Sequence, residues 1–303
     1  MSTSFRPSRS TLRAAALAAV AGVAVIATAD AAPDATAASP TRIHYGASLP
    51  LGRGKVRPYV VVDAQRADVP LEIGVALDEA VMEGLPTTGM GHAVGHKGPD
   101  HELALVFPTA NNPTPFKWAS LNWNVGGHEP PGVYDTPHFD FHFYTIDKAE
   151  RDRRIVLANP QFAAEADRLP ADELRPAHNL VLGPPGAAPS AIAVPLMGVH
   201  WVDRRSPELQ GMLGNPQGVR PFTATFIYGS WDGQFIFAEP MVTRAYLMAK
   251  RTATDPAVRD EVRPVGTAAR HAVPGWYPGA YRIAYDAAAK EYRVALVQLA
   301  KRD

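Results

Sequence analysis

Short apolar runs separated by proline and glycine follow one another along most of the chain. Several are rich in β-branched or aromatic residues and are only five to nine residues long, which is typical of strands. The clearest of them are 55–63, 70–77, 102–107, 116–123 and 138–146. The runs 223–228 with 234–237, and 281–285 with 291–299, flank turn sequences and predict two hairpins. The pattern therefore predicts a mainly β fold, either a barrel or a sandwich built from antiparallel hairpins.

Helical patterns are few and short. Asp147 precedes KAERDRRIVL in the position of a helix cap, and Asn159-Pro160 opens QFAAEADRL in the same way. Together they predict a helical insertion near 147–175. Asp78 is expected to cap another short helix over 78–85. The segment 239–250 fits a helix and a long strand equally well.

The first residues read as an export signal. Three arginines precede the uncharged apolar run 14–27, and an A-x-A cleavage pattern follows at 29–31. The run has about 14 residues, whereas a membrane-spanning helix needs roughly 17–25. We therefore expect a Sec-type signal peptide over 1–31 and a periplasmic or extracellular protein without stable membrane insertion after cleavage. An uncleaved anchor is the alternative.

The remainder is expected to hold a flexible linker over 32–41 and a β-rich domain over 42–303. A weak similarity between the sequences MGH at 90–92 and MGVH at 197–200 raises the alternative of two coupled β halves meeting near 147–190. The chain has no cysteine, so a hydrophobic core rather than disulfides must hold the fold in an oxidising compartment.

Composition and missing motifs exclude several functions. Beyond residue 31 the chain carries 27 basic and 29 acidic side chains, without the basic excess that nucleic-acid binding needs. There is no P-loop or Rossmann fingerprint, so we expect no nucleotide or flavin cofactor. A G-x-S-x-G elbow, an H-E-x-x-H motif and any thiol nucleophile are also absent.

The stretch PHFDFHFY at 137–144 is the most informative part of the chain. Side chains alternate across a strand, so its three phenylalanines share one face, which we expect to join the core. The other face then carries His138, Asp140, His142 and Tyr144. Imidazole, carboxylate and phenol groups are metal ligands and proton carriers rather than ordinary surface residues.

Strand geometry limits how these groups can bind an ion. Residues two apart are roughly 6.6 Å apart and can grip one ion, whereas His138 and His142 are about 13 Å apart. We therefore predict that Asp140 works with one histidine, completed from elsewhere in the chain. Asp140 could instead orient a ligating histidine through a hydrogen bond.

Three further residues could complete such a site. His128 lies in GGHEPPG, His200 in MGVHWVD, and Glu239 directly after the strand FIFA. The predicted metal ligands are His138, Asp140, His142, His200, His128 and Glu239, and zinc, iron or manganese would suit them. The histidines of the glycine-rich loop GHAVGHKGPDH, namely His92, His96 and His101, are interpreted as solvated.

The motifs PHFDFHFY, PLMGVHWVD and FIYGSWDGQFIFAEPMVTRAYL resemble those of a bacterial exported domain-of-unknown-function family found in thermophiles and soil bacteria. The resemblance covers roughly residues 42–300. It implies a β-rich fold and self-association, which would make the protein a homo-oligomer, and it assigns no catalytic residue. A looser likeness to cupins rests on paired histidines along a strand, although the H-x-H spacing of cupins is absent.

Two functions remain open at this point. The first is an exported β-rich protein that binds a divalent metal or a small ligand in a His/Asp pocket. The alternative is a metal-dependent enzyme, a hydrolase, lyase or cupin-like oxygenase, acting on a small molecule. Glu129 and Tyr144 are the candidate proton carriers in that case.

Overall fold

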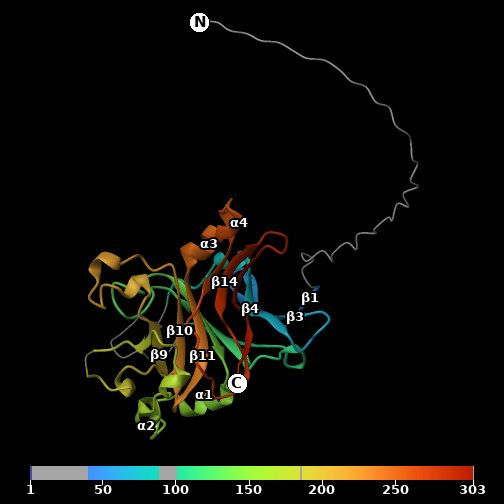
Figure 1. The fold of residues 1–303 in the computed structure, drawn as a ribbon. Coiled ribbons are helices and arrows are strands. Elements are labelled where there is room, and N and C mark those ends of the chain that lie inside the picture. The colour runs from blue at the N-terminus through green and yellow to red at the C-terminus, as the bar shows by residue number, and fades with distance from the viewer. Residues whose placement is uncertain (2–39, 89–100, 185, 303) are drawn as a thin grey trace, which may run out of the picture. The chain divides into compact units, whose positions relative to one another are not determined.

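Two antiparallel seven-stranded sheets pack face to face in the computed structural model, which describes residues 1, 40–88, 101–184 and 186–302 (Figure 1). Of the two arrangements open from the sequence, the sandwich is the one observed, and the predicted mainly β class is confirmed. The predicted signal peptide, most of the linker, and His92 and His96 lie outside the described residues.

The first sheet takes strands from both ends of the chain, in the order β1-β3-β4-β15-β14-β12, with β2 paired to β3. Its strands are β1 (Thr41–Tyr45), β2 (Leu49–Leu51), β3 (Gly54–Asp63), β4 (Pro70–Asp78), β12 (Asp260–Pro264), β14 (Ala280–Asp286) and β15 (Glu291–Val297). A separate two-stranded sheet pairs β13 (Gly275–Tyr277) with β16 (Ala300–Arg302).

The second sheet is formed by the middle of the chain, in the order β5-β6-β7-β11-β10-β9-β8. Its strands are β5 (Glu102–Val106), β6 (Trp118–Asn124), β7 (His138–Tyr144), β8 (Asn179–Val181), β9 (Val199–Asp203), β10 (Ala224–Trp231) and β11 (Gln234–Thr243). The predicted hairpins are both present, as β10-β11 and β14-β15. Asp232 and Gly233 both have positive φ, as the tight turn between β10 and β11 requires.

The helices are short and gather at the two ends of the strands (Figure 1). They are α1 (Lys148–Arg154), α2 (Phe162–Asp167), α3 (Arg244–Thr252) and α4 (Pro256–Arg259). Single 3₁₀ turns are η1 (Glu79–Met82), η2 (Thr109–Asn111), η3 (Asp172–Leu174), η4 (Pro189–Ala191), η5 (Pro207–Leu209) and η6 (Pro216–Gly218). The helical insertion expected near 147–175 is thus α1, α2 and η3. Among the described residues, no helix is long and apolar enough to span a membrane.

The helix ends differ from prediction in their caps. Asp147 and Asp78 occupy the cap positions, but Asp147 bonds to Lys117 and Asp78 accepts from the Lys55 amide, so neither side chain caps its helix. Asn159 accepts from the Gln161 amide, but α2 begins at Phe162, two residues after Pro160, the expected first helical residue. The prediction that Asp78 and Asp147 cap their helices was wrong because Lys55 and Lys117, which lie on other segments, bind these carboxylates instead.

The ambiguous segment 239–250 is both strand and helix. β11 continues to Thr243, whose hydroxyl then accepts from the Tyr246 amide and caps α3. Glu239 therefore lies inside a strand, where its direction is set by alternation.

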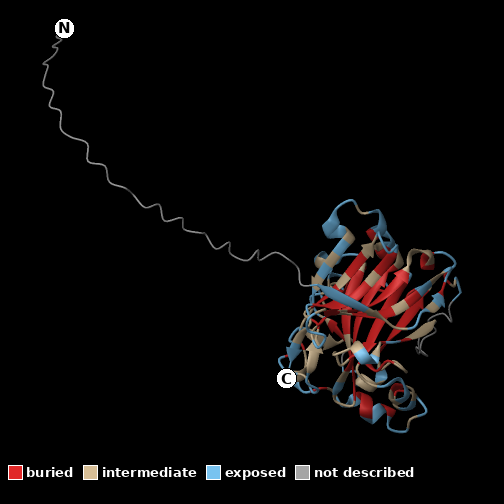
Figure 2. Ribbon diagram, turned by 90° about the vertical axis from the view of Figure 1, so that its right-hand side faces the viewer, coloured by how far each residue is buried: buried red, intermediate tan, exposed pale blue. Residues whose placement is uncertain are grey.

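The core lies between the sheets and includes the three phenylalanines of β7. Phe139, Phe141 and Phe143 are fully buried there, as the alternation predicts. The opposite face of β6 and β7 is buried as well, so that every residue of these two strands is buried. Figure 2 shows the buried strands in the middle of the fold. One end of that face packs against a cluster that includes Ile155 and Phe162, and the other against Tyr134 and Phe222. The polar side chains of β7 consequently lie in a covered layer and not in bulk water.

Candidate metal centre

Two groups of ligand-type side chains lie on this covered face. The first contains His128, His138 and Asp140, and the second contains His142, His200 and Glu239. In each group one ligand atom from every residue lies within 4.8 Å of the others. The six residues predicted as metal ligands are therefore brought together, but as two groups of three residues and not around one ion.

The first group is held by backbone carbonyls. His138 Nδ1 lies 2.7 Å from the Thr136 carbonyl, and His128 Nδ1 lies 2.7 Å from the Glu129 carbonyl. A carbonyl only accepts, so each Nδ1 donates, and in a neutral ring Nε2 is left with a lone pair. His138 Nε2 lies 3.1 Å from Asp140 Oδ1, and His128 Nε2 lies 3.5 Å from Oδ2.

A tight loop brings His128 over the strand. The His128 amide donates to the Tyr134 carbonyl at 3.2 Å, which closes the loop back on itself. Gly127 has a φ of 80°, and a Cβ added there would lie 2.0 Å from the same carbonyl oxygen, so only glycine fits. Asn124, on β6, donates to Asp140 Oδ2 at 2.6 Å and orients the carboxylate from the other side.

The second group spans three strands. His142 Nε2 of β7 lies 3.2 Å from Glu239 Oε1 of β11, and His200 Nε2 of β9 lies 3.7 Å from Glu239 Oε2. β10 separates β11 from β9, and Gly229 of β10 pairs with both His200 and Phe237. Because Gly229 has no side chain, the Phe237 ring fills this space and packs edge-on against both imidazoles.

Burial and neighbouring charges shift the pKa values of the two groups in different ways. Burial alone would raise the pKa of Asp140, but His138 and His128 outweigh it and hold this pKa well below its ordinary range. In the second group, burial lowers the pKa of His142 to about 3 against the opposing charge of Asp140. Burial, together with the nearby Asp140, raises the pKa of Glu239 well above its usual value. Burial therefore disfavours charge in the second group, whereas the imidazoles of the first group stabilise the charged form of Asp140.

Several of these atoms lack the hydrogen bonds that buried polar atoms normally make. Among the described residues, they are His138 Nε2, Asp140 Oδ1, both ring nitrogens of His142, and Glu239 Oε2. The side chains concerned are at most 3% exposed. More than nine in ten buried polar groups in proteins are paired, so such a concentration calls for an explanation.

The spacing of the ligand atoms fits a shared cation. Two ligand atoms that are each about 2.1 Å from one tetrahedral ion lie about 3.4 Å apart. The observed separations in the two groups are 3.1, 3.5, 3.2 and 3.7 Å. Both groups could therefore hold a metal ion.

The two candidate proton carriers are placed differently. The Tyr144 hydroxyl donates to the Leu196 carbonyl at 3.0 Å, and burial raises its pKa, so the phenol keeps its proton. Glu129 is exposed, and its backbone carbonyl serves as the acceptor for His128. His101 lies outside both groups, with Nε2 at 2.9 Å from the Thr88 carbonyl.

The polar row on β6 was missed from the sequence. Ser120, Asn122 and Asn124 pair across the ladder with His142, Asp140 and His138, and all three are buried. A signal for them exists, because ASLNWN alternates apolar and polar residues as regularly as PHFDFHFY does.

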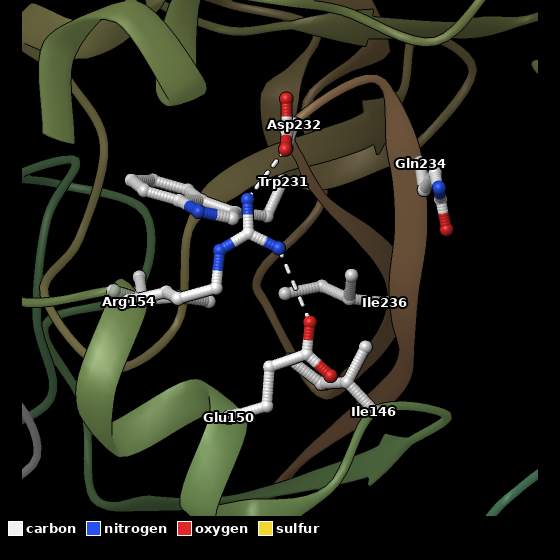
Figure 3. A pocket seen from close by; sticks show the side chains of 8 residues that line it. Ile146, Glu150, Arg154, Trp231, Asp232, Gln234 and Ile236 are labelled. Atoms are coloured by element: carbon white, nitrogen blue, oxygen red, sulfur yellow. Dashed lines mark hydrogen bonds and ion pairs between the residues drawn. The ribbon is translucent and has the colours of Figure 1, made fainter. Parts of the chain in front are cut away.

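Two cavities among the described residues lie away from both groups. One of about 70 Å³ surrounds Arg154, which is paired with Glu150 at 3.1 Å and also with Asp232 (Figure 3). Another of about 140 Å³ is lined in part by Glu208 and Arg263. Neither includes a histidine of the two groups.

Comparisons with protein-family models, with curated proteins and with solved structures found no match. The chemistry of the two groups is therefore what indicates a function.

Proposed function

We propose that the protein binds two divalent transition-metal ions, one in each group. The observation that carries this proposal is the set of buried, unpaired donor atoms at the spacing of ligands around one ion. Two imidazoles with one carboxylate suit zinc, non-haem iron or manganese. Binding would release protons, since the ligating forms are the neutral imidazole and the ionised carboxylate.

The test is elemental analysis of protein purified without an affinity tag and dialysed against zinc, iron(II) or manganese(II). We expect two equivalents of metal per chain. His138→Ala should remove one equivalent and His142→Ala the other, while His178→Ala, an exposed histidine outside both groups, should keep two. Protein that holds no metal in any of these conditions would refute the proposal.

A second candidate function is metal-dependent hydrolysis of a small molecule at the second group. It is favoured by the partial exposure of His200, whose side chain is 23% exposed while its partners are sealed. A site with three protein ligands leaves a position for water, and the ion lowers the pKa of that water. The candidate predicts ester or phosphoester hydrolysis that His142→Ala abolishes and His178→Ala leaves intact.

The compartment follows from the predicted signal peptide. We propose that residues 1–31 are removed on export and that the protein takes up its metal outside the cytoplasm. Mass spectrometry of the exported protein should give an N-terminus at Ala32, and an intact N-terminus would contradict this.

A further inference from the structure

One residue of the polar row on β6, Asn122, pairs with a member of the first group. Asn122 is the cross-strand partner of Asp140, and such partners have Cβ atoms about 4.5–5.5 Å apart. The side chain is fully buried, and one end of its carboxamide, the Nδ2 position, has no hydrogen-bond partner. Asp140 Oδ1, which lies 3.1 Å from His138 Nε2, also lacks a hydrogen-bond partner, and two such buried groups on paired strand positions suggest a missing ligand.

The hydrogen atoms of the neighbouring network decide which end of the amide faces Asp140. Ser120 Oγ lies 2.7 Å from Glu102 Oε1 and 3.2 Å from the Asn122 carboxamide. A hydroxyl has one hydrogen, and a carboxylate can only accept. The guanidinium of Arg151 donates to both oxygens of Glu102, so this carboxylate acts as an acceptor and takes the Ser120 hydrogen. The contact between Ser120 and Asn122 is then a hydrogen bond only if the amide nitrogen donates.

A half-turn of the carboxamide satisfies this requirement. The structure places Oδ1 against Ser120, but the oxygen and nitrogen ends of the group have the same shape and exchange without disturbing the packing. After the turn, Nδ2 donates to Ser120, and Oδ1 takes the end of the carboxamide that has no hydrogen-bond partner, on the strand position paired with Asp140. Two facing oxygen acceptors in a dry site cost free energy unless a cation or a donor lies between them.

We propose that Asn122 Oδ1 is the fourth ligand of the metal ion in the first group. A chain of hydrogen bonds holds it there, from Asn122 to Ser120 to Glu102, and ends on the charge of Arg151. The inference rests on the proposed metal binding of that group. It makes the first group a closed, four-ligand site of the structural kind, and it leaves the open coordination position to the second group.

The experiment isolates the first group in a His142→Ala background, in which only one zinc ion should bind. Zinc affinity is measured by competition with a chromophoric chelator, and the Co²⁺ form is followed by visible absorption. Asn122→Leu should still bind one ion but roughly 10–100-fold more weakly, with an altered Co²⁺ spectrum. Asn122→Asp, which keeps an oxygen at the same place and adds a charge, should bind at least as tightly as the parent.

Ser120→Ala tests the relay without changing the ligand itself. It should weaken zinc binding by about tenfold, because the amide is no longer held in one orientation. Asn215→Leu, a change at an exposed asparagine, is the control and should change nothing. Circular dichroism checks that each variant is folded.

The outcomes distinguish a failure of this inference from a failure of the proposed metal binding. If the His142→Ala parent binds no zinc, the metal site itself is wrong. If the parent binds and Asn122→Leu has the same affinity, Asn122 does not touch the ion. If Asn122→Asp is weakened as much as Asn122→Leu, an oxygen at this position does not serve as a ligand, and the inference is overturned.

Discussion

At the residue scale, glycines make room for the groups that carry the chemistry. Gly127 lets the loop turn back so that His128 reaches Asp140. Gly229 leaves the space in which Phe237 supports the second pair of imidazoles. In both places a side chain is excluded by a contact of 2.0 Å or less, so the constraint is steric and not one of hydrogen bonding.

Gly229→Ala tests this directly. The new Cβ would lie 1.9 Å from the Phe237 ring, which must move and take its packing against His142 and His200 with it. We expect a loss of about 1–3 kcal/mol in the free energy of unfolding, measured by urea titration. Zinc affinity of the second group should fall while the first group keeps its ion. Gly233→Ala, where nothing lies near the added carbon but φ is positive, separates backbone strain from the clash. Equal zinc affinity in the two variants would argue against the role of Phe237.

At the element scale, α3 is attached to the first sheet by one buried ion pair. Lys250 is 1% exposed, and its ammonium donates to Glu261 of β12 at 2.5 Å. Tyr246 of α3 donates to the same carboxylate, and Arg263 pairs with its other oxygen. This network therefore helps to fix α3 over the strands, together with the fully buried Leu247.

Glu261 should make stability depend on acid pH. Burial alone would raise its pKa, but the bonds from Lys250, Tyr246 and Arg263 outweigh it and lower the pKa from its ordinary 4.5 to about 2. A carboxyl whose pKa is lower in the folded state contributes stability above pH 4.5, and the contribution is lost as the pH falls towards 2. Since the side chain is partly exposed, we expect about 1–2 kcal/mol. Urea unfolding between pH 2 and pH 6 should show a flatter profile for Glu261→Gln, and an unchanged slope would contradict this.

At the scale of the whole molecule, the two groups of imidazoles and carboxylates replace part of the apolar packing on one face of a sheet. β6 and β7 are covered on both sides, yet the outward face of β7 carries two imidazoles and a carboxylate in place of hydrocarbon. Buried polar groups without partners lower stability, and a bound ion would supply the partners. The stability of the fold and the occupancy of the two groups should therefore be linked.

Metal removal should lower the thermal unfolding temperature. A ligand that binds only the folded state at 100 times its Kd adds about 2.7 kcal/mol, and two sites would add twice that. Dialysis against EDTA should shift the midpoint down by several degrees in scanning calorimetry, and added zinc should restore it. The double variant His138→Ala/His142→Ala should respond to neither treatment, so a response in that variant would point to metal elsewhere.

The sequence alone determined the mainly β class, the hairpins and the two-faced character of β7, because alternation and turn chemistry are local properties of a strand. It also named the six residues of the two groups, since imidazoles and carboxylates are out of place in strands of this kind. Only the tertiary structure decided that they divide into two threes, that both faces of β7 are covered, and that β11 ends at the α3 cap. Those outcomes depend on strand order and on which loop folds over which face, and such long-range pairings leave no periodic mark along the chain.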